Sequence, residues 1–270
     1  MAFSNFIGIV LGFLVIFLTI TMHSANGSAF LSTEGAMLVM GGTFAYALMS
    51  FPGRLVLQAM KAIVHMVTKP VHGPETLKDD IQRFVSWGYF IHSKGMKEFE
   101  RKVAEKLMDP ELRYGADLLV SGYNAEDVRR LMETAAETAF ERNTRPTAVL
   151  QNMAGSAPAF GMVGTLVGMV VMLANFESDM SKVGSGMAIA MIATFYGLVM
   201  ARLVFMPAAN NLNIKQEQVR FRNYLLAEGF ALLAEKRTAS FVQDALDSYM
   251  DPVHHQDLTH LRQRKNEPVL

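Results

Sequence analysis

Four apolar runs dominate the pattern of the chain, and they lie in two pairs at residues 6–22, 35–51, 157–176 and 184–206. None of the four contains Asp or Glu, and the third contains no charged residue. At a rise of about 1.5 Å per residue, a helix over the third run crosses a hydrocarbon core of about 30 Å. The pattern therefore predicts four membrane-spanning helices.

Small residues recur every three or four positions in the last two runs, so they occupy one face of each predicted helix. They are Ala157, Gly161, Gly164, Thr165 and Gly168 in the third run, and Gly186, Ala190, Thr194, Gly197 and Ala201 in the fourth. Lipid offers no hydrophobic gain from helix pairing, and small faces instead allow close packing of backbones. Because we do not expect one copy to satisfy both faces, they predict a homo-oligomer.

The segment between the second and third runs contains residues that typically begin or end helices. Pro74 stands at a first helical turn, Gly95 breaks that helix, and Asp109 precedes Pro-Glu as an N-cap. Gly122 closes the helix that Asp109 begins, and Asn124 caps a long helix that leads toward the third run. No stretch alternates between apolar and polar residues, so we predict an all-α fold without a sheet.

These elements predict an integral membrane protein in four parts. Residues 1–52 hold two spans and a short periplasmic linker, 53–153 form a cytoplasmic helical domain, and 154–207 hold the last two spans. Residues 208–270 form a helical tail that packs on the middle domain. The polar end of this tail contains His254, His255 and His260, and we expect it to be disordered rather than to bind metal.

The positions of the basic residues predict how the spans are oriented in the membrane. Lys and Arg gather in residues 52–156 and after Pro207, whereas the linker 23–34 has none and the linker 177–183 has only Lys182. The positive-inside rule places both large segments and both termini in the cytoplasm. A composition of 51% apolar and 19% charged residues agrees with a membrane protein that has a large aqueous part.

Several classes of function are disfavoured by what the chain lacks. It has no Cys, which excludes disulfides, thiolate metal sites and Cys nucleophiles. Motifs for nucleotide binding, serine hydrolases and zinc proteases do not occur, so we expect no enzyme, cofactor or metal site. The formal net charge is zero, which gives no indication of nucleic-acid binding.

The last two runs resemble those of a known family. SAPAFGMVGTLVGMVVML and MAIAMIATFYGLVMARLVFMP are similar to the third and fourth spans of the MotA/PomA family, the A subunits of bacterial flagellar stators. The Gly41-Gly42 dyad ahead of Ser50-Phe51-Pro52 resembles the second span of that family. Order, loop sizes and orientation also match, to about residue 250.

The resemblance implies a pentamer of A subunits in the bacterial inner membrane, around two MotB/PomB-type B subunits that anchor to peptidoglycan. Ion flow would turn the A ring and drive the switch protein of the cytoplasmic rotor. An ion-driven motor needs an ionisable group inside the membrane, and the four runs supply no carboxylate. In the family, an Asp on the single span of the B subunit fills this role, surrounded by the small-residue faces.

Residue roles follow from the resemblance. Thr165 and Thr194 match pore-facing threonines of the ion pathway, although a membrane threonine can instead bond the carbonyl one turn back. Pro158 and Pro207 match two prolines that serve as hinges, although a plain boundary proline is the alternative. The family's sodium-driven members have threonine at both pore positions, and the extra oxygen at Thr165 favours Na⁺ over H⁺ as the transported ion.

KGMKEFERKV resembles the helix that contacts the rotor, and it places Glu100 at the key acidic position. His92 stands where the family often carries an arginine, so Lys94, Lys97 and Arg101 are candidates for the positive charge. A run of mixed charges is otherwise a solvated face. Two rival functions are an energising complex of the ExbB/TolQ kind, which pulls on a periplasm-spanning partner, and a channel that works alone.

Overall fold

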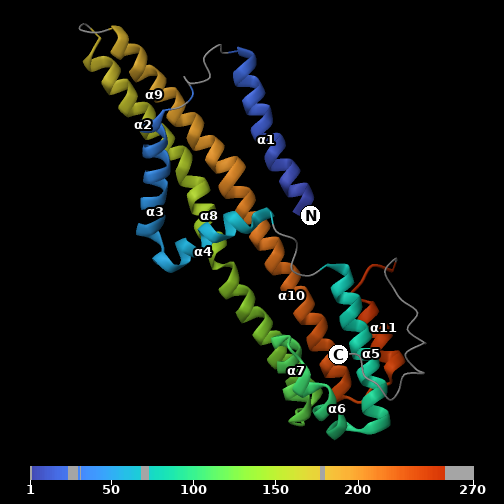
Figure 1. The fold of residues 1–270 in the computed structure, drawn as a ribbon. Helices are drawn as coiled ribbons and strands as arrows, with labels where there is room; N and C mark the ends of the chain where they lie inside the picture. Colours follow the sequence, from blue (N-terminus) through green and yellow to red (C-terminus); the bar gives the residue numbers. More distant parts are fainter. Residues whose placement is uncertain (1, 24–29, 31, 68–72, 177–179, 253–270) are drawn as a thin grey trace. The chain divides into compact units, whose positions relative to one another are not determined.

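The computed structural model describes residues 2–23, 30, 32–67, 73–176 and 180–252. The described residues form helices and no strand, as the sequence predicts (Figure 1). They fall into two compact units, each with its own contacts: residues 1–70 with 143–214, and residues 71–142 with 215–270. The predicted disorder of residues 254–270 concerns positions outside the described residues.

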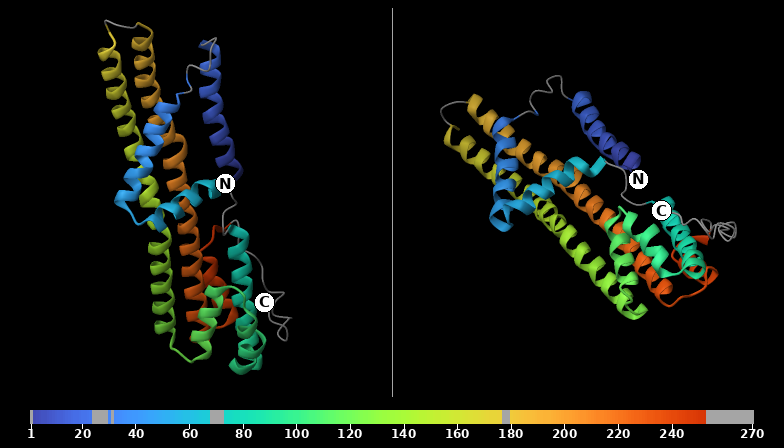
Figure 2. Two further views of the ribbon diagram at one scale, coloured as in Figure 1. Left: turned by 60° about the vertical axis from the view of Figure 1, so that its left-hand side comes forward. Right: turned by 60° about the horizontal axis from the view of Figure 1, so that its bottom comes forward.

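Unit 1 contains the apolar helices. The first is α1, Ala2–His23, and the second is a continuous run of α2, Thr33–Ala36, a π segment Met37–Gly41, and α3, Gly42–Ser50. The third and fourth are the later part of α8, Ala125–Ala174, and the run of α9, Met180–Val199, a π segment Met200–Phe205, and the start of α10, Met206–Ala234. Figures 1 and 2 show α8 and α9 side by side.

Both long helices continue through the prolines. Pro146 and Pro158 lie inside α8, and the stretch Val183–Ala234 is helical across Pro207, so these prolines do not end a helix. The π segment ends directly before α10, and the Met206 N–H bonds the Ala201 oxygen, five residues back. This wider turn lets the helix accept a proline whose ring would otherwise meet a carbonyl one turn earlier.

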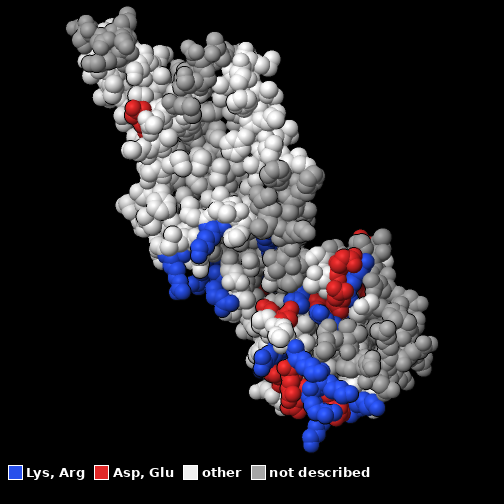
Figure 3. All heavy atoms as spheres, in the orientation of Figure 1, with Lys and Arg blue, Asp and Glu red and all other residues white. Residues whose placement is uncertain are grey.

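Unit 1 contains a further helix, α4, at Gly53–Val64, which the sequence pattern did not predict. A 3₁₀ turn, His65–Val67, follows it. Its buried face, Val56 and Ala59, packs in a core with Leu150 and Met153 of α8. On the face drawn in Figure 3, the Lys and Arg side chains of unit 1 gather where α4 lies, and most of the remainder is uncharged. This amphipathic pattern is typical of a helix at a membrane surface.

Unit 2 consists of shorter helices and the polar parts of α8 and α10. They are α5, Pro74–Lys94, α6, Met96–Lys102, a 3₁₀ turn, Ala104–Lys106, α7, Pro110–Val120, and α11, Ala239–Asp247. The predicted boundaries are confirmed. Asp109 Oδ1 accepts from the N–H groups of Glu111 and Leu112, and Asn124 Oδ1 accepts from the Asp127 N–H at 2.8 Å.

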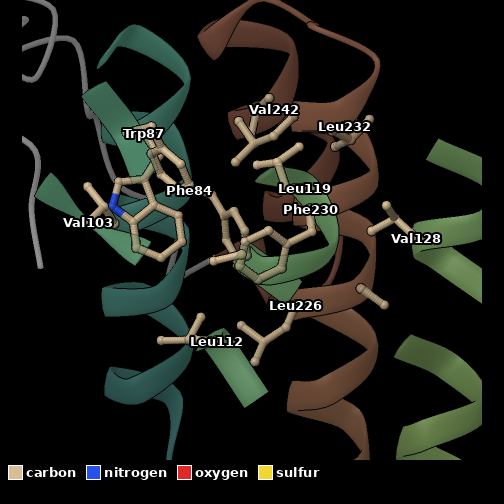
Figure 4. Close-up of a cluster of buried hydrophobic side chains, with 14 of the residues drawn as sticks. Phe84, Trp87, Val103, Leu112, Leu119, Val128, Leu226, Phe230, Leu232 and Val242 are labelled. Atoms are coloured by element: carbon tan, nitrogen blue, oxygen red, sulfur yellow. The ribbon is translucent and has the colours of Figure 1, made fainter. Parts of the chain in front are cut away.

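Aromatic side chains fill the core of unit 2 (Figure 4). Phe84 and Trp87 of α5 meet Phe230 of α10, and the Phe84 and Phe230 rings pack edge to face at 4.9 Å. Val242 and Leu246 of α11 are fully buried in the same cluster. The tail therefore packs on the middle segment, as the sequence predicts.

A buried ion cluster ties three helices of unit 2. Arg222 of α10 is only 3% exposed, and its Nε donates to Asp80 Oδ2 of α5 at 2.6 Å. Its Nη2 lies 2.8 Å from Asp109 Oδ2, at the start of α7. Burial opposes ionisation of Asp109, but the charge and hydrogen bond of Arg222 lower the pKa of this carboxyl overall. Burial and a hydrogen bond to Asp109 raise the pKa of Glu111.

Candidate functional site

The glycines of α8 pack directly on α9. A Cβ on Gly168 would lie 2.5 Å from the Gly186 oxygen, and one on Gly164 would lie 2.4 Å from the Ala193 Cβ. A Cβ on Gly161 would lie 3.0 Å from the Ala193 oxygen. Each glycine thus permits a backbone approach that any larger residue would prevent.

The glycines of α9 make the reciprocal contacts with α8. A Cβ on Gly197 would lie 2.6 Å from the Ala157 oxygen, and Ala190 is buried against Gly168. The two small-residue faces therefore satisfy each other within one chain. This corrects the sequence argument, which took them to require further copies, because periodicity gives the face of a helix but not its partner.

Thr165 and Thr194 meet at the centre of this interface, and both are partly buried. Their Oγ1 atoms are 2.5 Å apart. Thr165 Oγ1 also lies 3.1 Å from the Ala190 oxygen, and both hydroxyls lie 3.2 Å from the Gly161 oxygen. Two hydroxyls and two backbone carbonyls thus form a cluster of four oxygens.

This cluster combines the two roles considered for the threonines. Thr165 bonds the carbonyl one turn back on its own helix, at Gly161, and it also bonds across to α9. The hydroxyls bond one another and the two carbonyls, and the cluster supplies no ionisable group. Neither residues 143–176 nor 180–214 contain Asp or Glu, so the apolar part of α8, α9 and the start of α10 cannot provide a carboxylate.

The hinge candidates lie at different places in this arrangement. The Pro158 Cα is 3.1 Å from the position of a Cβ on Gly197, so Pro158 stands in the tight α8–α9 contact. Pro207 follows the π segment at the start of α10. Both positions lack a backbone donor inside a continuous helix, which marks them as points where a helix bends at low cost.

The candidate rotor residues lie on α5 and α6 of unit 2. Glu100, Lys94 and Lys97 are exposed, and no ion pair joins them to another described residue. Arg101 is committed to Glu98, with its Nη2 2.8 and 3.0 Å from the two carboxylate oxygens. That hydrogen bond leads the interactions that lower the pKa of Glu98.

His92 is placed differently from the other basic candidates. Its Nε2 lies 3.2 Å from the Arg237 oxygen, in the turn between α10 and α11. Sequence alone does not connect these two regions, because they are far apart along the chain. Among the described residues, no three His, Asp or Glu side chains gather within metal-binding range.

Two contacts at the α9 and α3 helices also escaped the sequence analysis. The Tyr196 hydroxyl donates to the Phe30 oxygen at 2.5 Å and accepts from the Ser32 N–H at 3.1 Å, which fixes the start of α2 to α9. In the Gly41-Gly42 dyad, only Gly42 is sterically required, because a Cβ there would lie 2.4 Å from the Phe160 ring. The available signal was a tyrosine inside an apolar run, because a buried tyrosine hydroxyl usually finds a hydrogen-bond partner.

Comparison with known proteins identifies the family. The sequence model of the MotA/TolQ/ExbB proton channel family matches residues 97–225. Motility protein A of Aquifex aeolicus is 31% identical over 76% of this chain and 80% of that protein. The chain belongs to the MotA/PomA family. Chemotaxis protein PomA of Vibrio alginolyticus is 27% identical over 93% of this chain and 96% of that protein.

The fold agrees with this membership. The structure titled C. jejuni MotAB matches with a TM-score of 0.84 at 18% identity, over 93% of this chain and 97% of that one. The family is a stator and ion-channel component of membranes. The resemblance found from the last two apolar runs and the Gly41-Gly42 dyad is therefore confirmed.

Proposed function

We propose that this chain is the ion-conducting A subunit of a flagellar stator, and that the α8–α9 oxygen cluster is part of its ion path. The cluster of Thr165, Thr194 and two carbonyls carries the proposal. It lies within helices that are long and apolar enough to cross a membrane. Polar groups inside a membrane are costly, and they commonly mark a substrate or ion pathway.

The missing carboxylate comes from a B-type partner in this proposal. The helices of the site contain no Asp or Glu, yet release and rebinding of an ion require a group that changes its charge. Two solved relatives are titled C. jejuni MotAB and the flagellar MotAB stator complex from Bacillus subtilis, which supports a second subunit. An Asp on a single span of that subunit would face the threonine hydroxyls.

The assembly is a pentamer of this chain around two B subunits, with four spans per copy and both termini in the cytoplasm of a bacterial inner membrane. Apolar side chains on the outward face of α8, such as Met162, Leu166 and Leu173, are exposed in one copy. Exposure of this kind fits contacts with lipid or with neighbouring subunits. A stable monomer in native mass spectrometry of the purified stator would contradict the pentamer.

Torque passes to the rotor switch protein through unit 2. Ion binding near Thr165 alters the α8–α9 contact, and Pro158 and Pro207 allow the long helices to bend. Glu100, Lys94 and Lys97 are exposed and unpaired among the described residues, which suits them to charge contacts with a partner. Arg101, held by Glu98, contributes less.

The coupling ion in this proposal is sodium. Na⁺ needs several oxygens to replace its water, and the Thr165 hydroxyl adds one oxygen beside Thr194, whereas H⁺ needs only the partner's carboxylate. Swimming speed should rise with external sodium at fixed pH. Thr165→Val keeps the branched shape but loses the hydroxyl and should abolish this dependence, whereas Thr165→Ser should retain it. Speed that is independent of sodium in the parent would leave a proton motor.

Deletion and complementation test the function itself. Removing the gene should abolish swimming, and the unaltered chain should restore it. Normal swimming after deletion, with loss of nutrient uptake or envelope integrity instead, would refute the stator function in favour of an energising complex of the ExbB/TolQ kind.

A further inference from the structure

An open groove of about 520 Å³ runs between α3 and α8 in unit 1. Its lining residues on α8 extend from Asn152 to Val163, and Tyr46 of α3 forms the other wall. The helix rises about 16 Å over this stretch, which is close to the depth of one leaflet when the hydrocarbon core is about 30 Å thick. The groove is therefore long enough to hold a lipid acyl chain across one leaflet.

The lining of the groove changes from apolar to polar along its length. Ala159, Phe160 and Val163 line the end toward the centre of the apolar run, whereas Asn152 and Ser156 line the end toward the polar part of α8. Asn152 Oδ1 is buried, and it has no hydrogen-bond partner among the described residues. An unsatisfied buried oxygen is costly, so a ligand that brings a hydroxyl donor would be stabilised at this end.

Two arginines stand beyond the polar end of the groove. Arg145 lies on the same face of α8 as Asn152, two turns earlier, and Arg54 is in the first turn of α4, just after α3 ends. Both arginines are exposed, and neither forms an ion pair with a described residue. Among the described residues of unit 1, Glu34 is the one acid, and it lies at the start of α2, at the far end of that span. The polar end of the groove is therefore positive and has no internal counterion.

We propose that the groove binds one anionic phospholipid with a hydroxyl in its headgroup, of the phosphatidylglycerol type. One acyl chain lies along α8 between Gly155 and Val163. The phosphate contacts Arg145 and Arg54, and a headgroup hydroxyl donates to Asn152. A single lipid thus matches the apolar length, the charge and the unpaired oxygen of the site together.

Other occupants match fewer of these features. Free phosphate would satisfy the two arginines but would leave the apolar part of the groove open. A second copy of the chain would cover the apolar part, but its spans bring no described carboxylate to the arginines, because Glu34 lies at the opposite end. The proposal rests on the proposed membrane topology of unit 1 and not on torque generation.

Two substitutions fill the groove and leave its charge unchanged. They are Gly155→Leu and Ala159→Leu. An added Cβ on Gly155 would meet nothing within 4 Å, and Ala159 is exposed, so neither change should disturb the packing of α8. Gly8→Leu is the matched control, because Gly8 of α1 also has open space around an added Cβ but does not line the groove.

Three further substitutions address the headgroup. Arg145→Gln and Arg54→Gln each remove one cation, and Asn152→Leu removes the amide at similar volume. Arg113→Gln, on an exposed arginine of α7 in unit 2, controls for the loss of one positive charge elsewhere. The full chain is purified in detergent, phosphatidylglycerol or phosphatidylcholine is titrated in, and native mass spectrometry counts the lipids bound to each copy.

We expect the parent to bind one phosphatidylglycerol per copy and to bind phosphatidylcholine more weakly. Each arginine variant should weaken phosphatidylglycerol binding about fivefold, the usual effect of one basic residue near an anionic lipid surface. Asn152→Leu should cost a similar factor for phosphatidylglycerol and nothing for phosphatidylcholine, because only the former offers a hydroxyl. The groove-filling variants should lose binding, and both controls should match the parent.

Equal affinity for the two lipids in the parent would overturn the proposal, and this comparison holds even where a variant fails to accumulate. Unchanged phosphatidylglycerol binding in Gly155→Leu and Ala159→Leu would also overturn it. Displacement of the lipid by inorganic phosphate would make the site a free-phosphate site. Break-up of the oligomer by both groove-filling changes in lipid-free detergent would assign the groove to a neighbouring copy. None of these results decides the stator function, which is tested by swimming of the complemented deletion strain.

Discussion

Replacing Arg222 with Met should destabilise unit 2 through a buried charge rather than through lost packing. Arg222 is 3% exposed, and it contacts Asp80, which is fully buried, at 2.6 Å. Without the guanidinium, the Asp80 carboxylate keeps only Arg83, at 3.0 Å, as its ionic partner among the described residues. Methionine fills much of the vacated volume, so the variant isolates the electrostatic effect.

The expected cost is about 3–5 kcal/mol, the usual effect of removing one partner from a buried ion pair. At about 2–4 °C per kcal/mol for a protein of this size, the midpoint of unfolding should fall by about 10 °C. Trp87, the single tryptophan of the chain, is fully buried in the core of unit 2. Its emission therefore follows the unfolding of this unit in the detergent-solubilised protein.

The double variant Asp80→Asn with Arg222→Met identifies the cause. It leaves no uncompensated charge at position 80, so it should recover at least half of the stability lost in Arg222→Met. Equal instability of the single and double variants would refute the electrostatic argument and indicate that the hydrogen bonds of Arg222 to α5 and α7 hold the unit together.

Three further predictions concern other parts of the molecule. Gly168→Ala should cost about 1–3 kcal/mol and impair ion flux, because its Cβ would lie 2.5 Å from a backbone oxygen, whereas Gly184→Ala, with open space, should be neutral in thermal unfolding and flux assays. The lowered pKa of Asp109 makes its stabilisation fully present above its unfolded pKa of about 3.9 and lost as pH falls below it. Asp109→Asn, which keeps the N-cap, should therefore flatten the acid side of the stability curve measured by Trp87 emission. Glu100→Lys should reduce torque with no change in oligomer size on native gels, and unchanged torque would assign Glu100 to the solvated face.

The helix ends of unit 2 were predictable because the residues that set them act within one turn. Asp109 and Asn124 cap their helices, Gly95 and Gly122 adopt positive φ, and each does so through bonds to residues within one turn. The prolines inside helices were the exception. A proline usually ends a helix, but α8 continues through Pro146 and Pro158, and the π segment before α10 carries that helix across Pro207.

The chemistry of the candidate site was predictable only in part. Thr165 and Thr194 stood out by resemblance and by their places on small-residue faces. That they share a 2.5 Å contact, with the Gly161 and Ala190 carbonyls as further neighbours, depends on how α8 and α9 are aligned along each other. The register of α8 against α9 results from the fit of glycines to atoms of the facing helix. The periodicity of one helix contains no information about this register.

The sequence by itself determined the all-helical class, the apolar runs, most helix ends and the family, because composition, periodicity and capping residues act over a few positions. Tertiary structure decided which faces meet, how Asp80, Asp109 and Arg222 come together, and that His92 bonds Arg237 in the turn between α10 and α11. These contacts join residues far apart in the chain. They are chosen by packing and by the cost of burying a charge without a partner, which depend on the whole arrangement rather than on any local pattern.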